Sequence, residues 1–152
     1  MRIGLISDTH GLLRPAAVER LRGAAHIVHA GDIGALEILT ELRALAPLTA
    51  VRGNNDRALW ARGVRATETV QIGEVSVHVV HDLAELAIDP AAHGVRVVVC
   101  GHSHRPHIEE RGGVLYVNPG SAGPRRFRLP IAVARLEIDG TSVRATIEEL
   151  TV

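Results

Sequence analysis

The sequence predicts an α/β fold in which two packed, mixed β-sheets carry helices on their outer faces. Two features of the chain order support this class. The first half alternates short apolar runs with helix-like segments, and the second half is a series of apolar runs joined by hairpin signals. The composition agrees: 46% of the 152 residues are hydrophobic but only 2% are aromatic. A core built from Val, Leu, Ile and Ala suits buried sheets flanked by helices.

The first half of the chain is interpreted as a β-α-β-α-β unit. Strands are predicted at residues 2–6, 26–29 and 48–51, and helices at residues 15–22 and 35–44. Pro15 falls in the first turn of its helix, where the missing N–H costs least. This order implies parallel strands with the helices packed outside.

The second half is interpreted as a series of hairpins with one buried strand between them. Apolar runs at 67–72 and 75–80 meet at Gly73-Glu74, and residues 83–92 suit a short helix followed by a buried strand at 95–100. Two further hairpins pair 106–110 with 114–117 around 111–113, and 131–138 with 143–150 around 139–140. These strands require a second sheet. No repeat or linker appears, so one domain spanning residues 1–152 is expected.

The charge balance constrains the partners. The chain has 17 basic and 17 acidic residues, and every basic residue is Arg. A nucleic-acid binder normally shows a basic face, so the balance weighs against a nucleic-acid partner. The one short basic cluster is Arg125, Arg126 and Arg128. It is interpreted as a solvated loop, with a phosphate clamp as the alternative.

Cysteine usage and hydropathy favour a cytoplasmic protein with no membrane association. Cys100 is the only cysteine, so no internal disulfide forms, and it lies in an apolar run where a small buried residue is expected. No signal peptide is recognisable at the start of the chain. No apolar stretch approaches the ~20 residues needed to span a bilayer.

Polar side chains collect where the apolar runs end. Five such groups occur: Ser7-Asp8-Thr9-His10, Gly31-Asp32, Gly53-Asn54-Asn55-Asp56, His81-Asp82 and Gly101-His102-Ser103-His104. In α/β sheets, sites form beyond the carboxyl ends of the strands, so these groups are expected to meet. The glycine before a candidate ligand in three of the groups lets the backbone turn tightly and leaves room for an ion.

The spacing within these groups predicts which side chains converge. In extended backbone, residues i and i+2 point to the same side, so Asp8 and His10 are expected to aim at one place. The same holds for His102 and His104. His81 shares its parity with buried valines, whereas His78 has the opposite parity and is expected to be exposed.

The candidate ligands are carboxylates, imidazoles and amides, without a thiolate. This mixture excludes a cysteine-based structural zinc site and suits Mn, Fe, Co, Ni or Zn. Their number exceeds what one ion needs. It fits two ions that share a bridging carboxylate, ~3.5–4 Å apart.

These ordered motifs, together with Asn118-Pro119-Gly120-Ser121, resemble the calcineurin-like metallophosphoesterase superfamily and, within it, the small YfcE-like phosphodiesterases. The resemblance implies a two-sheet αββα sandwich and two divalent metal ions, with manganese expected and Fe, Ni, Co or Zn as alternatives. Family members often form dimers, so a homodimer is a candidate assembly. The implied ligand sets are Asp8, His10 and His104 for the first ion and Asn54, His81 and His102 for the second, with Asp32 bridging both.

Two residues depart from the family pattern. Asn55 stands where a His commonly contacts the phosphate, and an amide donates a hydrogen bond but supplies no proton. Asn55 is therefore the candidate catalytic residue, with a role in stabilising the phosphoryl oxygens. Asp82 stands where Gly is common. It is interpreted as a helix N-cap, with a carboxylate that orients a ligand His as the alternative.

The remaining histidines and the only Trp have structural interpretations. His29 is expected in the core or behind a ligand, whereas His26, His93 and His107 are expected at the surface. Trp60 is predicted to lie either near the site or over the hydrophobic core. The turn at 118–121 is expected to support the His102 loop.

The function that these features predict is a phosphodiesterase that hydrolyses small phosphate diesters with a hydroxide held between two metal ions. Because no general acid is evident, diesters with good leaving groups are the expected substrates. The alternatives are a non-catalytic scaffold on the same fold, as in the small subunit of retromer, and a nuclease. The presence of a coordinating side chain at all seven ligand positions favours the enzyme.

Overall fold

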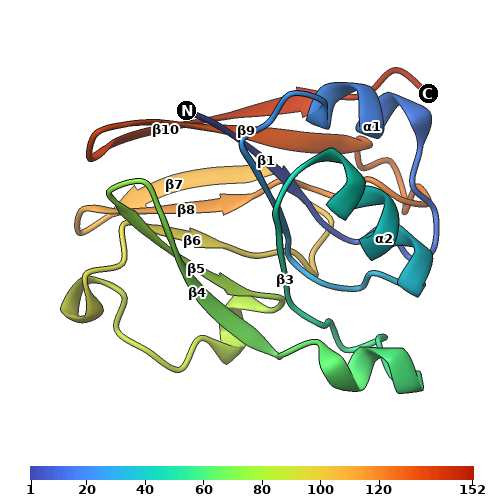
Figure 1. The fold of residues 1–152 in the computed structure, drawn as a ribbon, viewed down its shortest axis with the longest axis horizontal. Helices are drawn as coiled ribbons and strands as arrows, with labels where there is room; N and C mark the ends of the chain where they lie inside the picture. The colour runs from blue at the N-terminus through green and yellow to red at the C-terminus, as the bar shows by residue number, and fades with distance from the viewer.

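The computed structural model describes all 152 residues and contains two five-stranded β-sheets packed face to face (Figure 1). The first sheet has the order β10-β9-β1-β2-β3, in which β1, β2 and β3 are parallel and β9 and β10 are antiparallel to their neighbours. Its strands are β1 (Arg2–Ile6), β2 (His26–His29), β3 (Leu48–Ala50), β9 (Ala132–Asp139) and β10 (Ser142–Glu149).

The second sheet has the order β4-β5-β6-β8-β7. Its three central strands are parallel, and the two edge strands are antiparallel to them. Its strands are β4 (Thr67–Ile72), β5 (Val75–Val80), β6 (Val97–Val99), β7 (His107–Arg111) and β8 (Val114–Asn118). Both sheets are mixed, so the predicted fold class is confirmed.

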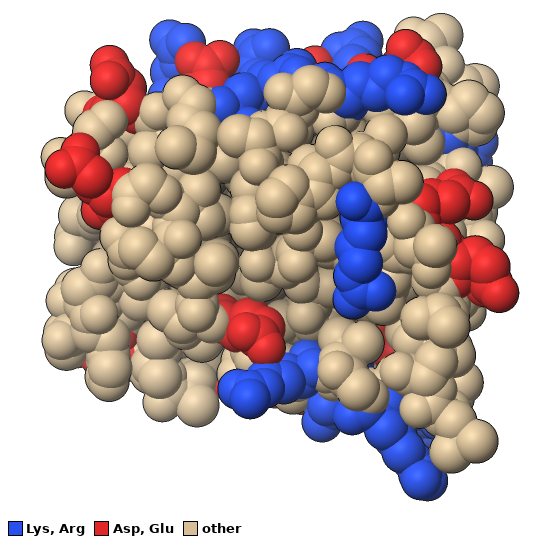
Figure 2. Space-filling view, viewed as in Figure 1, with Lys and Arg blue, Asp and Glu red and all other residues tan.

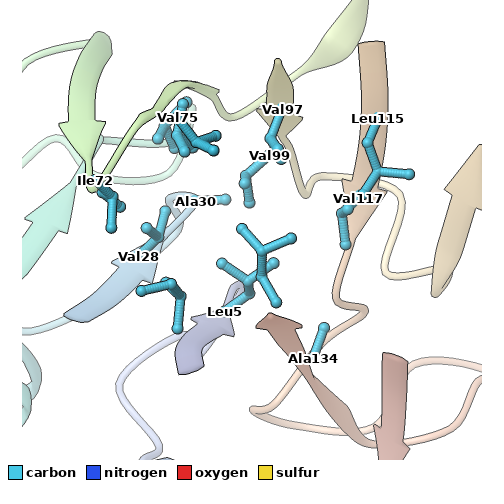
Figure 3. Close-up of a cluster of buried hydrophobic side chains, with 14 of the residues drawn as sticks. Leu5, Val28, Ala30, Ile72, Val75, Val97, Val99, Leu115, Val117 and Ala134 are labelled. Atoms are coloured by element: carbon cyan, nitrogen blue, oxygen red, sulfur yellow. The ribbon is translucent and has the colours of Figure 1, made fainter. Parts of the chain in front are cut away.

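The core between the sheets is a cluster of 16 buried aliphatic residues (Figure 3). Leu5 and Val28 of the first sheet face Val97, Val99 and Val117 of the second, and all five are fully buried. Burial of each such side chain contributes about 1.5–3 kcal/mol before entropy is counted. The two sheets therefore form a rigid support for the loops that leave their strands.

The outer layers of the two sheets differ. Two α-helices, α1 (Pro15–Leu21) and α2 (Leu36–Leu45), cover the outer face of the first sheet (Figure 1) and contribute Leu21, Leu39 and Leu42 to a second buried cluster. The second sheet has no α-helix, because the predicted helix at 83–92 is replaced by two short 3-10 helices, η2 (Leu83–Glu85) and η3 (Ala91–His93). Pro90 explains the difference, since proline disfavours helical backbone at the residue before it.

His78 is buried, which contradicts the exposure predicted from its parity. It lies on the outer face of the second sheet, where Val80 and Val98 form a third cluster with Leu83 and Leu86 packed against it. The parity argument assumed that this face was open to water. The His78 ring instead pairs with the Thr69 hydroxyl through Nδ1 at 2.7 Å, and burial lowers its pKa.

The bounds of most other predicted elements are confirmed to within two residues. The turns of the β7–β8 and β9–β10 hairpins begin one residue later than predicted. The turns lie at Gly112-Gly113 and Gly140-Thr141. Gly112, Gly113 and Gly140 have positive φ angles of 56°, 79° and 61°. Such angles suit glycine in tight hairpin turns. A further 3-10 helix, η1 (Leu59–Gly63), follows β3.

None of the helices has the length and hydrophobicity needed to cross a membrane. On the face shown in Figure 2, arginine and acidic side chains gather mostly near the rim, around a wide uncharged area. The arginines form a row along the upper edge of this face and a second group along its lower edge.

Candidate metal centre

The loops that follow the parallel strands of both sheets meet at one end of the sandwich. Asp8 follows β1, Asp32 follows β2, His81 follows β5, and His102 and His104 follow β6. Backbone hydrogen bonds join the loops: the Asp8 N–H donates to the Gly31 carbonyl and the Gly101 N–H donates to the His81 carbonyl, both at 2.9 Å. The predicted meeting of these groups is therefore observed.

The first cluster of potential ligand atoms contains Asp8, His10 and His104. Asp8 Oδ1 lies 3.3 Å from His104 Nε2 and 3.7 Å from His10 Nε2. The two Nε2 atoms are 3.4 Å apart. Three donor atoms at this spacing, all within 4.8 Å of one another, suit the coordination shell of a single cation.

The second cluster contains Asp8, Asp32 and His81. Asp32 Oδ2 lies 3.3 Å from His81 Nε2 and 3.7 Å from His10 Nε2. Asp8 Oδ1 lies 3.9 Å from His81 Nε2, so Asp8 belongs to both clusters. Asp32 Oδ2 thus lies near one histidine from each predicted ligand set.

Asn54 and His102, the other two predicted ligands, lie at the rim. Both side chains are exposed, and with His81 they line a hollow of about 500 Å³. The His102 ring stands edge-on to the His81 ring at 5.2 Å. The structure thus brings five of the seven predicted ligands tightly together and leaves these two facing the open hollow.

Asn55 contacts Asp32. Its side-chain amide donates to Asp32 Oδ2 and its backbone N–H donates to Asp32 Oδ1, each at 2.9 Å. In this geometry Asn55 fixes the orientation of the Asp32 carboxylate.

Asp82 combines the two alternatives considered for it. Its Oδ1 accepts a hydrogen bond from the Ala84 N–H at 3.0 Å, as an N-cap of η2 does. Its Oδ2 lies 3.7 Å from His102 Nε2. One carboxylate therefore starts the 3-10 helix and faces a predicted ligand.

The electrostatics of the two clusters favour a bound cation. Burial by itself would raise the pKa of Asp8, but the neighbouring His10 and His104 rings and a hydrogen bond from Ser7 hold it well below its usual range. Burial likewise opposes ionisation of Asp32, yet the adjacent His81 ring and two hydrogen bonds from Asn55 lower its pKa to about 2. Both carboxylates are therefore ionised at neutral pH.

Three buried polar atoms of the clusters have no hydrogen-bond partner: Asp8 Oδ1, His81 Nε2 and His104 Nδ1. A buried polar atom without a partner costs about 1–3 kcal/mol, so such atoms are rare in native proteins. A divalent cation is the partner that suits a carboxylate oxygen and an imidazole nitrogen together. The residues present therefore fit a metal ion.

Five of the seven candidate ligands share an unusual backbone conformation. Asp8, His10, Asp32, His102 and His104 have positive φ angles of 54°, 46°, 53°, 72° and 62°. This observation corrects the predicted reason for their convergence, because these residues are left-handed rather than extended. Non-glycine residues in this region cost of order 1–3 kcal/mol each and are typical of functional sites.

The model of the calcineurin-like phosphoesterase superfamily domain matches residues 1–141. The chain belongs to the calcineurin-like phosphoesterase superfamily.

Relatives within this superfamily are similar along most of the chain. It is 35% identical to a "Probable metallophosphoesterase" of Methanothermobacter thermautotrophicus over 97% of this chain and 91% of that protein. Among solved structures, a "Novel Archaeal Phosphodiesterase" has a TM-score of 0.76 with 25% identity, and covers 97% of this chain and 100% of that one. Vps29 of Entamoeba histolytica in complex with zinc has a TM-score of 0.74 with 25% identity, and covers 98% and 99%. The predicted family is confirmed.

Three glycines let the strand ends of this phosphoesterase domain approach one another. A Cβ on Gly31 would lie 2.7 Å from His81 Nδ1, and one on Gly53 or Gly101 would collide with the Asp32 or Asp8 carboxylate. The room left by the absence of a side chain at these glycines is therefore occupied by the side chains of candidate ligands.

Several supporting residues have the positions that were predicted. His29 is fully buried, with its ring nitrogens paired to the Thr9 hydroxyl at 3.0 Å and the Gly31 N–H at 3.1 Å. The Asn118 amide donates to the Gly101 carbonyl at 3.0 Å and to Ser103 Oγ at 3.1 Å, which supports the His102 loop.

The other predicted surface and core positions agree in part. His93 and His107 are exposed, whereas His26 is half-buried with Nε2 2.8 Å from the Thr49 hydroxyl. Trp60 packs against the buried cluster under the helices.

Asp56 is the main supporting residue that the sequence analysis left without a role. Its buried carboxylate accepts hydrogen bonds from the backbone N–H groups of Ile33 and Gly34 at 3.0 Å and of Gly53 at 2.9 Å. It therefore ties the loop of Asp32 to the loop of Asn54. Its position in the polar group Gly53–Asp56, directly after a predicted strand, could have indicated a role at the site. Ser7 was also passed over, and its hydroxyl donates to Asp8 Oδ2 at 2.7 Å.

Proposed function

We propose that this member of the superfamily is a phosphodiesterase that uses two divalent cations to hydrolyse small phosphate diesters. The observation that carries the proposal is the pair of overlapping ligand clusters, which share Asp8 and contain the unpartnered atoms Asp8 Oδ1 and His81 Nε2. Names of relatives such as "Phosphodiesterase" of Methanocaldococcus jannaschii, 28% identical, support the reaction class.

In this proposal each ion has its own set of residues. The first ion is held by Asp8, His10 and His104, and the second by Asn54, His81 and His102, with Asp32 bridging. The rim positions of Asn54 and His102 support the second set, because both side chains face the same hollow as His81. Manganese is the proposed metal, with Fe, Ni, Co or Zn as alternatives.

The residues of the chain prepare the site for phosphate. When bound, two divalent cations acidify the attacking water and supply positive charge for the phosphate oxygens. Asp8 and Asp32 remain ionised at neutral pH, so both carboxylates can bind cations without first losing a proton. Asn55 fixes Asp32 through two hydrogen bonds, and a second N–H of its amide is available to a phosphoryl oxygen.

The expected substrate range follows from the absence of a general acid that could protonate the leaving group. Asn55 occupies the position from which a histidine would supply a proton, and an amide cannot do so. The expected substrates are diesters whose leaving group departs without protonation, such as aryl esters.

Hydrolysis of bis-p-nitrophenyl phosphate with Mn²⁺ tests the proposal. Asp32→Ala and His81→Ala are expected to lower kcat/KM by more than about 100-fold and to reduce the metal content of the purified protein. His93→Ala is the matched control, because this histidine is exposed and bonds only to the Asp89 carbonyl. If both variants keep full metal-dependent activity and metal content, the ligand assignment is wrong.

A non-catalytic scaffold is the second candidate, favoured by the structural likeness to Vps29. In that case the wild-type protein binds divalent metal in equilibrium dialysis but turns over no phosphate ester with Mn, Fe, Co, Ni or Zn. Metal-dependent turnover that the Asp32→Ala variant loses would exclude it.

A further inference from the structure

The loop between Pro124 and Pro130 presents an exposed aromatic side chain that the proposed chemistry does not use. Phe127 is 91% exposed and is one of only three aromatic residues in the chain. It has a positive φ angle of 54°, although it is not glycine. Exposure and strain both oppose folding, so neither is explained by stability.

This loop is held in shape by its own hydrogen bonds. The Leu129 N–H donates to the Arg126 carbonyl, and the Arg125 guanidinium donates to the Leu129 carbonyl, each at 3.1 Å. The Phe127 ring is therefore presented at the tip of a closed turn, flanked by Arg126 and Arg128.

The base of the loop is joined to the metal centre. Ser121 Oγ donates to the Asp8 carbonyl and the Ala122 N–H donates to the Ser7 carbonyl, both at 3.0 Å. Gly123 packs so closely on the Thr9 carbonyl that a side chain would not fit there. The loop thus has a fixed position relative to the first ligand cluster.

Two adjoining hollows connect the metal centre to Phe127. The inner hollow, of about 720 Å³, has Gly101, His102, Arg105 and Leu129 among its lining residues. The outer hollow, of about 530 Å³, is lined by Arg105, Phe127, Arg128 and Leu129. They share Arg105 and Leu129, so the two hollows adjoin at these residues and are together called the groove.

The charges along the groove change sign. The inner hollow is lined by two acids, Asp82 and Glu149, and one arginine, Arg105, whereas the outer hollow has Arg105 and Arg128 and no acid. A second anionic group on a substrate is therefore bound more favourably at the outer hollow than at the inner one. Arginine binds phosphate well, and an exposed aromatic ring stacks on a nucleobase.

We propose that this groove is the substrate subsite, and that it selects nucleotide diesters which carry a second phosphate. The scissile phosphate lies at the His102 end, a base stacks on Phe127, and the second phosphate contacts Arg105 and Arg128. This inference rests on the proposed phosphodiesterase function and specifies its substrate class.

Binding to the metal-free protein tests the subsite without any turnover. The variant Phe127→Trp, in EDTA at low salt, is titrated with the 5′-phosphorylated dinucleotide pTpT while tryptophan fluorescence is followed. Saturable quenching is expected, and adding Arg128→Ala is expected to weaken binding about tenfold. The affinity is also expected to fall as salt is raised, because arginine–phosphate contacts release counterions.

The matched control is Leu59→Trp, which puts a tryptophan at another exposed hydrophobic position, 75% exposed and outside the groove. It is expected to show no saturable quenching. Equal quenching in both variants, or none in Phe127→Trp, would overturn the proposal. A change from dimer to monomer in Phe127→Ala, measured by sedimentation, would also overturn it, because Phe127 would then be an assembly contact.

Kinetics separate the subsite from the reaction itself. In Phe127→Ala with Mn²⁺, the ratio of kcat/KM for pTpT to that for bis-p-nitrophenyl phosphate is expected to fall about tenfold. An unchanged ratio would contradict the subsite. If the wild-type protein hydrolyses neither ester, the proposed function fails, while the titration in EDTA still decides whether the groove binds nucleotides.

Discussion

Replacing Asp56 by Ala is expected to destabilise the metal-free protein and to loosen the metal centre. The Asp56 carboxylate is 6% exposed and joins two loops through three backbone N–H donors. Two of these donors, on Ile33 and Gly53, are fully buried, whereas the Gly34 donor lies at the edge of the buried region. The substitution removes all three bonds and supplies no substitute acceptor.

The size of the effect follows from the two buried donors. A hydrogen bond to a charged group contributes about 1.5–3 kcal/mol, and a buried donor left without a partner costs a similar amount. Water can reach the Gly34 N–H, so its loss is partly compensated. The free energy of unfolding is therefore expected to fall by about 3 kcal/mol. Because Asp32 and Asn54 lie in the two loops that Asp56 joins, metal affinity is expected to fall about 10- to 100-fold.

Urea unfolding in EDTA measures the first effect, and equilibrium dialysis against Mn²⁺ measures the second. Asp89→Ala is the control, since this exposed carboxylate accepts no hydrogen bond and its loss is expected to change stability by less than about 0.5 kcal/mol. Asp56→Asn, which keeps one acceptor oxygen, is expected to recover part of the loss. A loss of less than about 1 kcal/mol in Asp56→Ala, with unchanged manganese affinity, would refute the positioning role.

Two further predictions concern the packing and the protonation of the site. Gly101→Ala is expected to lower stability by about 1–3 kcal/mol in urea unfolding, because its Cβ would collide with Ser7 and Asp8, whereas Gly63→Ala meets open space and should be neutral. Burial lowers the pKa of His29 to about 4, so its stabilising contribution is complete above pH 6.5 and is lost as the pH falls through 4. This change amounts to at most about 3 kcal/mol. Metal-free His29→Gln is expected to lose this pH dependence, and an unchanged slope of stability between pH 6.5 and 4 would contradict it.

The strands and the meeting of the ligands were predictable because both follow from local patterns. β2, β4 and β5 have the bounds that their apolar runs predicted, since an aliphatic run between turn signals has few alternatives to a strand. The polar residues after these runs meet because the carboxyl ends of parallel strands lie at one edge of a sheet. Asp8, Asp32 and His81 were predicted in this way.

The remaining features depend on tertiary structure. His78 is buried on the face of the sheet against which Leu83, Leu86 and Ile88 pack, and no local pattern predicts that cover. Asp56 bonds to residues about 20 positions earlier in the chain, which its own sequence neighbours do not indicate. The groove beside Phe127 likewise joins the loop after β6 to the loop before β9.

The left-handed backbone of Asp8 and His10 explains how the side chains of two nearby candidate ligands come together. In an extended strand, residues i and i+2 lie about 7 Å apart and their side chains are parallel, so their tips do not converge. Asp8 Oδ1 and His10 Nε2 nevertheless lie 3.7 Å apart, because both residues have positive φ angles that fold the chain back on itself. This conformation is costly for Asp and His, and it persists because Ser7 and Asp56 hold the loops against the rigid strands. The conformational strain is therefore concentrated in the residues whose side chains have to meet.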